Sequence, residues 1–191
     1  METCVGERYR GARTLAIDPR IRRVGYAYFE GASLLDWGVK NVQADVPSVR
    51  VRRRLVPMIA EMLDSYEPTA LIVPDVRQGR VRRSRQVQLT VRAVIREATN
   101  RRIQVFPVTS KRVQTAFRSV CDEPRPNKEA INRQIVHWFP ELQPSLPKAR
   151  RLWESERHFT PLFDAIAMFC AWIGVPDHAR GKRKSITPSK F

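Results

Sequence analysis

Three aspartates lie where a carboxylate can take part in chemistry. Asp18 and Asp75 each follow a short apolar run, and Asp164 lies within a long one. Carboxylate oxygens are hard ligands that hold Mg²⁺, with Mn²⁺ as a substitute. Two such ions can hydrolyse a phosphodiester, because one activates a water while the other stabilises the departing 3′-oxygen. The three acids, as metal ligands and catalytic residues, therefore predict a metal-dependent phosphodiester hydrolase.

Two of these acids also have a purely structural interpretation, which the sequence leaves open. Asp18 can cap the turn that begins at Pro19. Asp164 can interact with the dipole of its own helix, which is worth about 0.3–1 kcal/mol. Asp164 is still the most informative acid, because an ionised carboxylate in a helix that is apolar on all sides is costly unless something compensates it. A shared divalent cation compensates far more fully than a helix dipole does.

The net charge favours a polyanionic partner. The chain has 35 Lys and Arg against 19 Asp and Glu, a formal charge of +16, so nucleic acid is the first candidate. A membrane surface is less favoured, because the basic residues do not follow one long amphipathic helix. The arginine cluster at 77–85 is either a solvated loop or a phosphate-binding segment. The predicted nucleic-acid-binding residues are Arg20, Arg22, Arg23, Arg77, Arg80, Arg82, Arg83, Arg85 and Lys128.

Cysteine usage and hydropathy exclude other classes. Cys4, Cys121 and Cys170 are scattered and lack Cys-x-x-Cys spacing, which argues for a reducing compartment and against a zinc site. The N-terminus has no apolar signal core. The longest apolar run, 165–175, is too short to span a bilayer. We therefore expect a cytoplasmic protein, or a nuclear one if the source has a nucleus.

The elements that must position the acids form an α/β pattern. Short turns join the first three strands into antiparallel hairpins, and the fully apolar fourth is typical of a central parallel strand. Together they predict a mixed five-stranded sheet, antiparallel hairpin strands plus parallel strands, flanked by helices. The predicted strands are 14–18, 24–29, 33–39, 69–73 and 103–108.

Helical periodicity and start signals predict the helices. Ser48 caps a helix that runs to Tyr66, and Pro57 kinks or restarts it. Further helices cover 86–100, follow caps at Ser110 and Asn127, and start at Thr160-Pro161. A mobile loop is expected at 140–152. One domain, 13–176, lies between a disordered basic N-terminus, 1–12, and a basic tail, 177–191.

The order of these elements, together with four short motifs, resembles the ribonuclease H-like fold. Within that fold the chain is most similar to the RuvC type of Holliday-junction resolvase, over roughly residues 13–175. The motifs are TLAIDPRIRRVG (14–25), PTALIVPDV (68–76), NKEAINRQIVHWFPEL (127–142) and FDAIA (163–167). The resemblance implies four-way-junction DNA as the partner, Mg²⁺ as the cofactor and a homodimer that makes two symmetric nicks. It also implies that Asp18 and Asp164 are catalytic and that Lys128 contacts DNA.

Two positions depart from the family pattern. The catalytic Glu of the family falls on Pro74, and Asp75 comes one residue later, which points it to the other sheet face unless the strand bulges or ends there. A further acid or histidine of the family falls on Pro161. The ligand missing there would come from just before the helix, where we name His158 as the candidate, with Glu154 and Glu156 as alternatives.

Three hypotheses follow. The first is a RuvC-like, Mg²⁺-dependent endonuclease acting on branched DNA. The second is a non-catalytic nucleic-acid-binding protein of the same fold, in which the degraded acids no longer hold two metals. The third, a phosphotransferase of the actin or sugar-kinase type, needs a second domain and a glycine-rich phosphate turn, for which 191 residues with 8 glycines leave no room.

Overall fold

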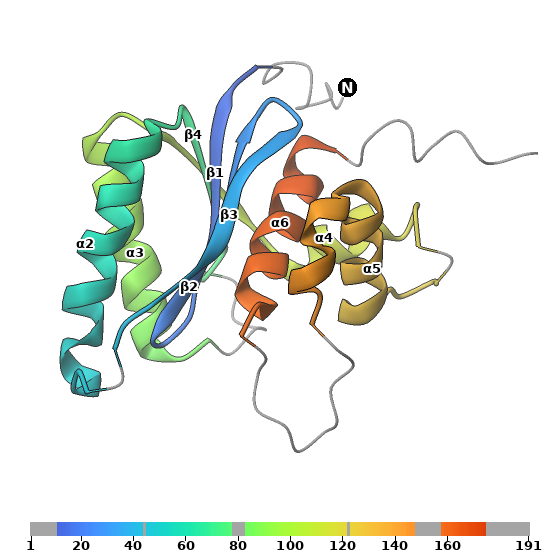
Figure 1. The fold of residues 1–191 in the computed structure, drawn as a ribbon. Coiled ribbons are helices and arrows are strands. Elements are labelled where there is room, and N and C mark those ends of the chain that lie inside the picture. Colours follow the sequence, from blue (N-terminus) through green and yellow to red (C-terminus); the bar gives the residue numbers. More distant parts are fainter. Residues whose placement is uncertain (1–10, 44, 78–82, 122, 148–157, 175–191) are drawn as a thin grey trace, which may run out of the picture.

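A computed structural model describes residues 11–43, 45–77, 83–121, 123–147 and 158–174. A five-stranded sheet in the order β3-β2-β1-β4-β5 lies at its centre (Figure 1). The first three strands pair antiparallel, whereas β1–β4 and β4–β5 pair parallel. The predicted mixed sheet is therefore confirmed. The strands are β1 (Arg13–Pro19), β2 (Arg23–Glu30), β3 (Ser33–Asn41), β4 (Ala70–Pro74) and β5 (Gln104–Val108).

Helices cover both faces of this sheet (Figure 1). One face is covered by α2 (Ser48–Tyr66) and α3 (Arg85–Asn100), and the other by α6 (Thr160–Ile173). Beyond α6 lie α4 (Ser110–Phe117) and α5 (Lys128–Trp138). Because α6 is enclosed between the sheet and these helices, it is buried nearly all round, as its sequence predicts.

The alternation of side chains along β1 determines which layer each residue faces. Leu15 and Ile17 join the core under α2 and α3, whereas Ala16 joins the core under α6. Since successive side chains of a strand point to opposite faces, Asp18 follows Ala16 onto the α6 face. The first catalytic candidate therefore faces the helix that carries Asp164.

Aromatic packing anchors α6 to the sheet. The ring of Phe169 on α6 stacks on Phe29 of β2, with centroids 3.5 Å apart and planes at 4°. Both rings are buried, so the pair stabilises this contact chiefly by removing their apolar surface from water. This contact helps to hold α6 in register with β1 and β2.

Three helices begin one residue earlier or later than their predicted caps imply. The side chain of Thr109, rather than Ser110, caps α4 by accepting a hydrogen bond from the Arg112 N–H at 3.1 Å. Ser48 and Thr160 are the first residues of α2 and α6, whose N-caps have no side-chain hydrogen bond. Thr109 and Ser110 have similar capping preferences, which explains the shift in α4, whereas the N-caps of α2 and α6 are Pro47 and Phe159, which offer no side-chain oxygen.

Other predicted helix features are confirmed or corrected. The side-chain oxygen of Asn127 caps α5 by accepting the Ala130 N–H at 2.9 Å, as predicted. Pro57 lies inside α2, which continues through it. The expected loop at 140–152 contains a 3₁₀ helix, η1 (Pro140–Ser145). The expected N-terminal segment lies outside the described residues except for its last two, and the tail lies wholly outside them.

The outer strand β5 contains a proline on its open side. Gln104 donates its N–H to Thr69 and Val108 accepts from Asp75, so these residues bond inward to β4 and its flanks. By alternation Pro107 faces outward, where its missing N–H breaks no ladder. As for membranes, none of the helices in the described ranges combines the length and the apolar character needed to cross a bilayer.

Candidate functional site

A cavity of about 1110 Å³ lies at the carboxyl ends of β1 and β4. Parallel strands end there together, which is where α/β sheets usually place their ligands. Its walls combine charged groups from the β1–β2 turn with an apolar floor. The basic side chains that line it are Arg20, Arg22, Arg23, Arg83, Lys111 and Lys128, and the acidic ones are Asp75 and Asp164.

Three helices point their N-termini at this cavity. Their capping residues Ser84, Thr109 and Asn127 all line its wall. A helix N-terminus carries about half a positive charge, because its first N–H groups have no partner inside the helix. The backbone therefore adds to the positive potential that the arginines and lysines create.

Asp18 lies at the end of β1, is 0% exposed, and is held between two guanidinium groups. Arg20 Nε lies 2.7 Å from Oδ2, and Arg83 Nη1 lies 2.7 Å from Oδ1. Burial raises the pKa of Asp18, Arg83 and Arg20 act against that rise, and the nearby Asp164 adds to it. Both carboxylate oxygens of Asp18 are thus neutralised by arginine.

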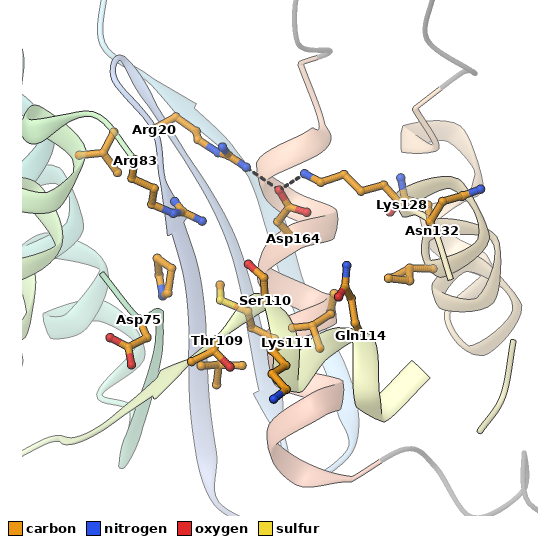
Figure 2. Close-up of a pocket in the computed structure, with 18 of the residues that line it drawn as sticks. Arg20, Asp75, Arg83, Thr109, Ser110, Lys111, Gln114, Lys128, Asn132 and Asp164 are labelled. Atoms are coloured by element: carbon orange, nitrogen blue, oxygen red, sulfur yellow. Dashed lines mark hydrogen bonds and ion pairs between the residues drawn. The ribbon is translucent and has the colours of Figure 1, made fainter. Parts of the chain in front are cut away.

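Asp164 completes the same charge network from α6. Its Oδ2 accepts from Arg20 Nη2 and from Lys128 Nζ, the latter at 2.8 Å (Figure 2). Arg20 therefore bridges Asp18 and Asp164, which are 146 positions apart in the 191-residue chain. The structure brings these two predicted acids together, with a guanidinium between them.

A glycine allows α6 to approach this closely. Gly25 is the partner of Asp18 in the β1–β2 ladder. A Cβ on Gly25 would lie 2.1 Å from the backbone carbon of Pro161 and 2.2 Å from the nitrogen of Leu162. The first turn of α6 therefore rests on bare backbone beside Asp18, which positions Asp164 one turn further on.

Asp75 lines the cavity but takes no part in this network. Its N–H donates to the Val108 carbonyl at 2.9 Å, so the strand alternation continues through it. The β1–β4 register pairs Ala16 with Ile72, and two residues further on it brings Pro74, not Asp75, beside Asp18. Asp75 instead accepts the Arg77 N–H at 2.9 Å, and Figure 2 shows its carboxylate directed away from Asp164.

The remaining predicted residues divide between the cavity and the surface. Arg22 and Arg23 line the cavity, and Arg22 also donates to the carbonyls of Gln43 and Val46. His158 is exposed and does not line the cavity. Arg77 and Arg85 are exposed outside the charge network. Arg80, Arg82, Glu154 and Glu156 lie outside the described residues.

Sequence reasoning did not identify Lys111, Gln114 and Asn132, which also line the cavity. The predicted caps of α4 and α5 were the available signal. Side chains that closely follow a cap lie at the same end of the helix, so they line the same cavity. The bridging role of Arg20 had no local signal, since it depends on how α6 docks.

The described residues do not fit a two-metal centre. Among them no group of three or more His, Cys, Asp and Glu side chains lies close enough to hold a metal ion. Proline stands at both positions where the resemblance to RuvC-type resolvases implies a ligand, Pro74 and Pro161, and arginines contact both oxygens of Asp18. Mg²⁺ keeps several waters and needs only one or two carboxylates from the protein, so the obstacle here is that Arg20, Arg83 and Lys128 already contact the oxygens of Asp18 and Asp164.

Comparison with known proteins identifies the fold. No protein-family model and no curated protein matches the chain by sequence. Thermus thermophilus RuvC is 20% identical, with a TM-score of 0.58 over 84% of this chain and 92% of that one. RuvC of the same organism in complex with a Holliday junction substrate is 20% identical, with a TM-score of 0.60 over 89% and 96%.

The yeast mitochondrial Holliday junction resolvase Ydc2 is 14% identical, with a TM-score of 0.60 over 86% of this chain and 79% of that one. Each of these three likenesses covers more than four fifths of this chain. The chain thus has the ribonuclease H-like fold of RuvC-type resolvases, as the sequence motifs predict.

Proposed function

We propose that this protein binds branched DNA, with phosphates of the strand junction seated in the cavity at the ends of β1 and β4. The observation that carries the proposal is the convergence of Arg20, Arg83 and Lys128 around two carboxylates. The carboxylates are neutralised by these contacts, so the cavity keeps an excess of positive charge. A reducing, cytoplasmic setting and a homodimer belong to the same proposal.

The chemistry of the lining favours phosphodiesters. Six basic side chains face the cavity against two acidic ones, and three helix N-termini point at it. Arginine binds phosphate through a planar fork of N–H donors, and helix N-termini bind anions through backbone N–H groups. Contacts of this kind supply most of the sequence-independent affinity of proteins for DNA.

The fold of the chain favours branched DNA over a straight duplex. A neighbour of the same fold was solved with a Holliday junction substrate, and the similarity covers 96% of that chain. A junction brings several backbones together at its centre, which suits a concave basic site better than a single straight duplex does. Branched DNA is therefore the first substrate to test.

Fluorescence anisotropy with a labelled four-way junction, in buffer containing a chelator, tests the proposal. The control is a duplex made from one arm of the junction. We expect tighter binding to the junction and affinity for both DNAs that falls steeply with salt. Equal affinity for both DNAs, or affinity that does not depend on salt, would contradict the proposal.

A second candidate function is cleavage of the bound junction with Mg²⁺, or Mn²⁺ in its place. It is favoured by one observation: a single side chain, Arg20, contacts both Asp18 and Asp164, so the two acids lie at the same end of the site. Incubating the protein and its Asp164→Asn variant with a labelled junction and either metal tests it. Product from the wild type but not from the variant would support cleavage, and no product would leave binding as the function.

A further inference from the structure

We propose that Arg20 and Arg83 take the place of divalent cations in this site, so that it binds a DNA phosphate without metal. Asp18 and Asp164 then act as positioning residues that hold the guanidinium groups in place. The inference rests on the proposed function, because it names the groups through which the cavity binds DNA.

The burial of Asp18 assigns it a positioning role. With 0% of its surface exposed, it cannot contact DNA directly, and each of its oxygens lies 2.7 Å from an arginine nitrogen. The two arginines reach it from different elements, Arg20 from the β1–β2 turn and Arg83 from the segment before α3. Asp18 therefore brings two guanidinium groups to the same point at the end of β1.

Further contacts restrict each arginine. Arg83 also donates to the carbonyl of Pro19 at 3.2 Å, and Arg20 also contacts Asp164. An arginine fixed by two acceptors has already lost most of its rotamer freedom, so less entropy remains to be lost when it binds a ligand. The pair is thus organised before any DNA arrives.

The three basic side chains of the site are partly exposed and line the cavity, so a ligand in the cavity can reach them. The side chains of Arg20, Arg83 and Lys128 are 23%, 15% and 64% exposed, and all three line the cavity. Their positive charges exceed the negative charges of Asp18 and Asp164. An anion that enters the cavity therefore meets a net positive cluster rather than a pair of carboxylates.

The floor of the cavity favours a nucleotide over a free inorganic anion. Val87, Val108, Val113, Ile131 and Met168 line it beneath the charged rim. An apolar floor offers nothing to inorganic phosphate, whereas the sugar and base of a nucleotide can pack against it. The ligand class is thus a phosphodiester within a nucleic acid strand.

The effect of Asp164→Asn on junction affinity distinguishes the proposed role from its alternatives. A carboxylate that only repels DNA would be improved by neutralisation, so the variant would bind more tightly. A metal ligand would matter in Mg²⁺ but not in chelator. A positioning residue for Arg20 and Lys128 predicts weaker binding in both conditions, with partial rescue by Asp164→Glu.

The test measures junction affinity of each variant with EDTA and with Mg²⁺, and follows folding by circular dichroism. We expect wild-type affinity to agree within about twofold in the two conditions. Arg20→Lys, which keeps the charge but loses the fork, should lose about tenfold, close to the lower limit for one lost charged hydrogen bond. Arg96→Gln, which removes an exposed α3 arginine outside the cavity, is the matched control and should change little.

Two results would overturn the inference while leaving the proposed function intact. One is junction binding that strengthens about tenfold in Mg²⁺ and loses that gain in Asp164→Asn. The other is unchanged affinity in a well-folded Arg20→Lys. Absence of binding to both junction and duplex would instead overturn the proposed function itself.

Discussion

At the scale of single residues, the fully buried carboxylate of Asp18 carries a large desolvation cost. An ionised carboxylate out of contact with water is tolerated only when cations and hydrogen-bond donors compensate it. Arg20 and Arg83 provide that compensation from two directions. Removing the carboxylate would leave the partly buried guanidinium of Arg83 without its counter-charge and that of Arg20 with Asp164 alone.

Asp18→Asn is therefore expected to lower the free energy of unfolding by about 3 kcal/mol, which is typical of breaking a buried ion pair from one side. Urea denaturation followed by circular dichroism measures the change. Asp75→Asn is the control, because asparagine keeps the oxygen that accepts the Arg77 N–H, and it should stay within about 0.5 kcal/mol of wild type. Equal stability of the two variants would contradict the assigned role of Asp18.

Substituting Pro74 tests whether a third carboxylate would allow the site to bind Mg²⁺. Because it lies beside Asp18 on the same face, Pro74→Glu would add a third carboxylate to the pair of Asp18 and Asp164. We expect thermal stability of this variant to increase with Mg²⁺, since a ligand that binds the folded state stabilises it. Pro74→Gln, similar in shape but uncharged, should not respond. No Mg²⁺ response in Pro74→Glu would mean that the arginines hold the acids too firmly for metal to compete.

Asp18 and Asp164 show which features of the site can be predicted from the sequence and which cannot. Asp18 and Asp164 were identified from the apolar segments that contain or precede them, because a carboxylate in such a setting needs a partner. The identity of the partner was not predictable. Arg20 meets Asp164 across 144 positions, and only the docking of α6 creates that contact.

At the scale of elements, the contact between α6 and β2 determines whether the site forms. The backbone of Pro161 and Leu162 occupies the space where Gly25 would carry a Cβ. Backbone atoms cannot move aside as the end of a flexible side chain can, so any larger residue must displace the whole first turn of α6. The distance between Asp164 and Arg20 depends on that turn.

Gly25→Ala is expected to destabilise the fold by about 3 kcal/mol, at the upper end for overpacking. It should also weaken junction binding, because α6 carries Asp164 away from Arg20. Gly38→Ala is the control, since its Cβ would meet only ring atoms of Tyr26 at 3.1–3.3 Å, which can shift. Urea denaturation and anisotropy measure the two effects, and a larger loss in Gly38→Ala would contradict this account of α6.

The burial of α6 also predicts how its cysteine reacts. Burial raises the pKa of Cys170 to about 12. The thiol of the unfolded chain keeps its ordinary, lower pKa and therefore ionises first. The free energy of unfolding accordingly has its full value below about pH 9 and falls as the pH rises toward 12. We expect iodoacetamide to modify Cys170 in urea but not in the native protein at mildly alkaline pH, as peptide mass spectrometry would show. Equal native and denatured rates would contradict its burial.

Element types and order were predictable, whereas exact helix starts were not. Strand and helix periodicities and the turn residues identified every strand of the sheet. The starts of α2, α4 and α6 were each displaced by one residue, and for α4 the reason is that Thr109-Ser110 offers two competent caps. Only the backbone geometry of the folded chain selects between them.

At the scale of the whole molecule, the charge of +16 is partly concentrated around one end of the sheet. The combination of antiparallel hairpin strands with parallel strands was predicted from the sequence, whereas the spatial order β3-β2-β1-β4-β5 comes from the structure, and the similarity to RuvC confirms the fold. The division into termini and core was not tested, because most of the terminal residues lie outside the described ranges.

This concentration of charge predicts the salt dependence of DNA binding. If the six basic side chains of the cavity each contact one phosphate, duplex affinity should fall about 10³-fold between about 50 and 200 mM salt. Anisotropy titrations at several salt concentrations measure the slope. A slope near zero would contradict a binding mode that depends on phosphate contacts.

The proline on the open side of β5 has a consequence for self-association. Exposed sheet edges act as templates on which strands of other molecules can add, which leads to aggregation. At Pro107 the backbone carbonyl of an incoming strand would have no N–H donor. The hydrogen-bond ladder of an added strand would therefore be interrupted within β5. Oligomers of this protein should therefore assemble through side-chain surfaces rather than by extending the sheet past β5.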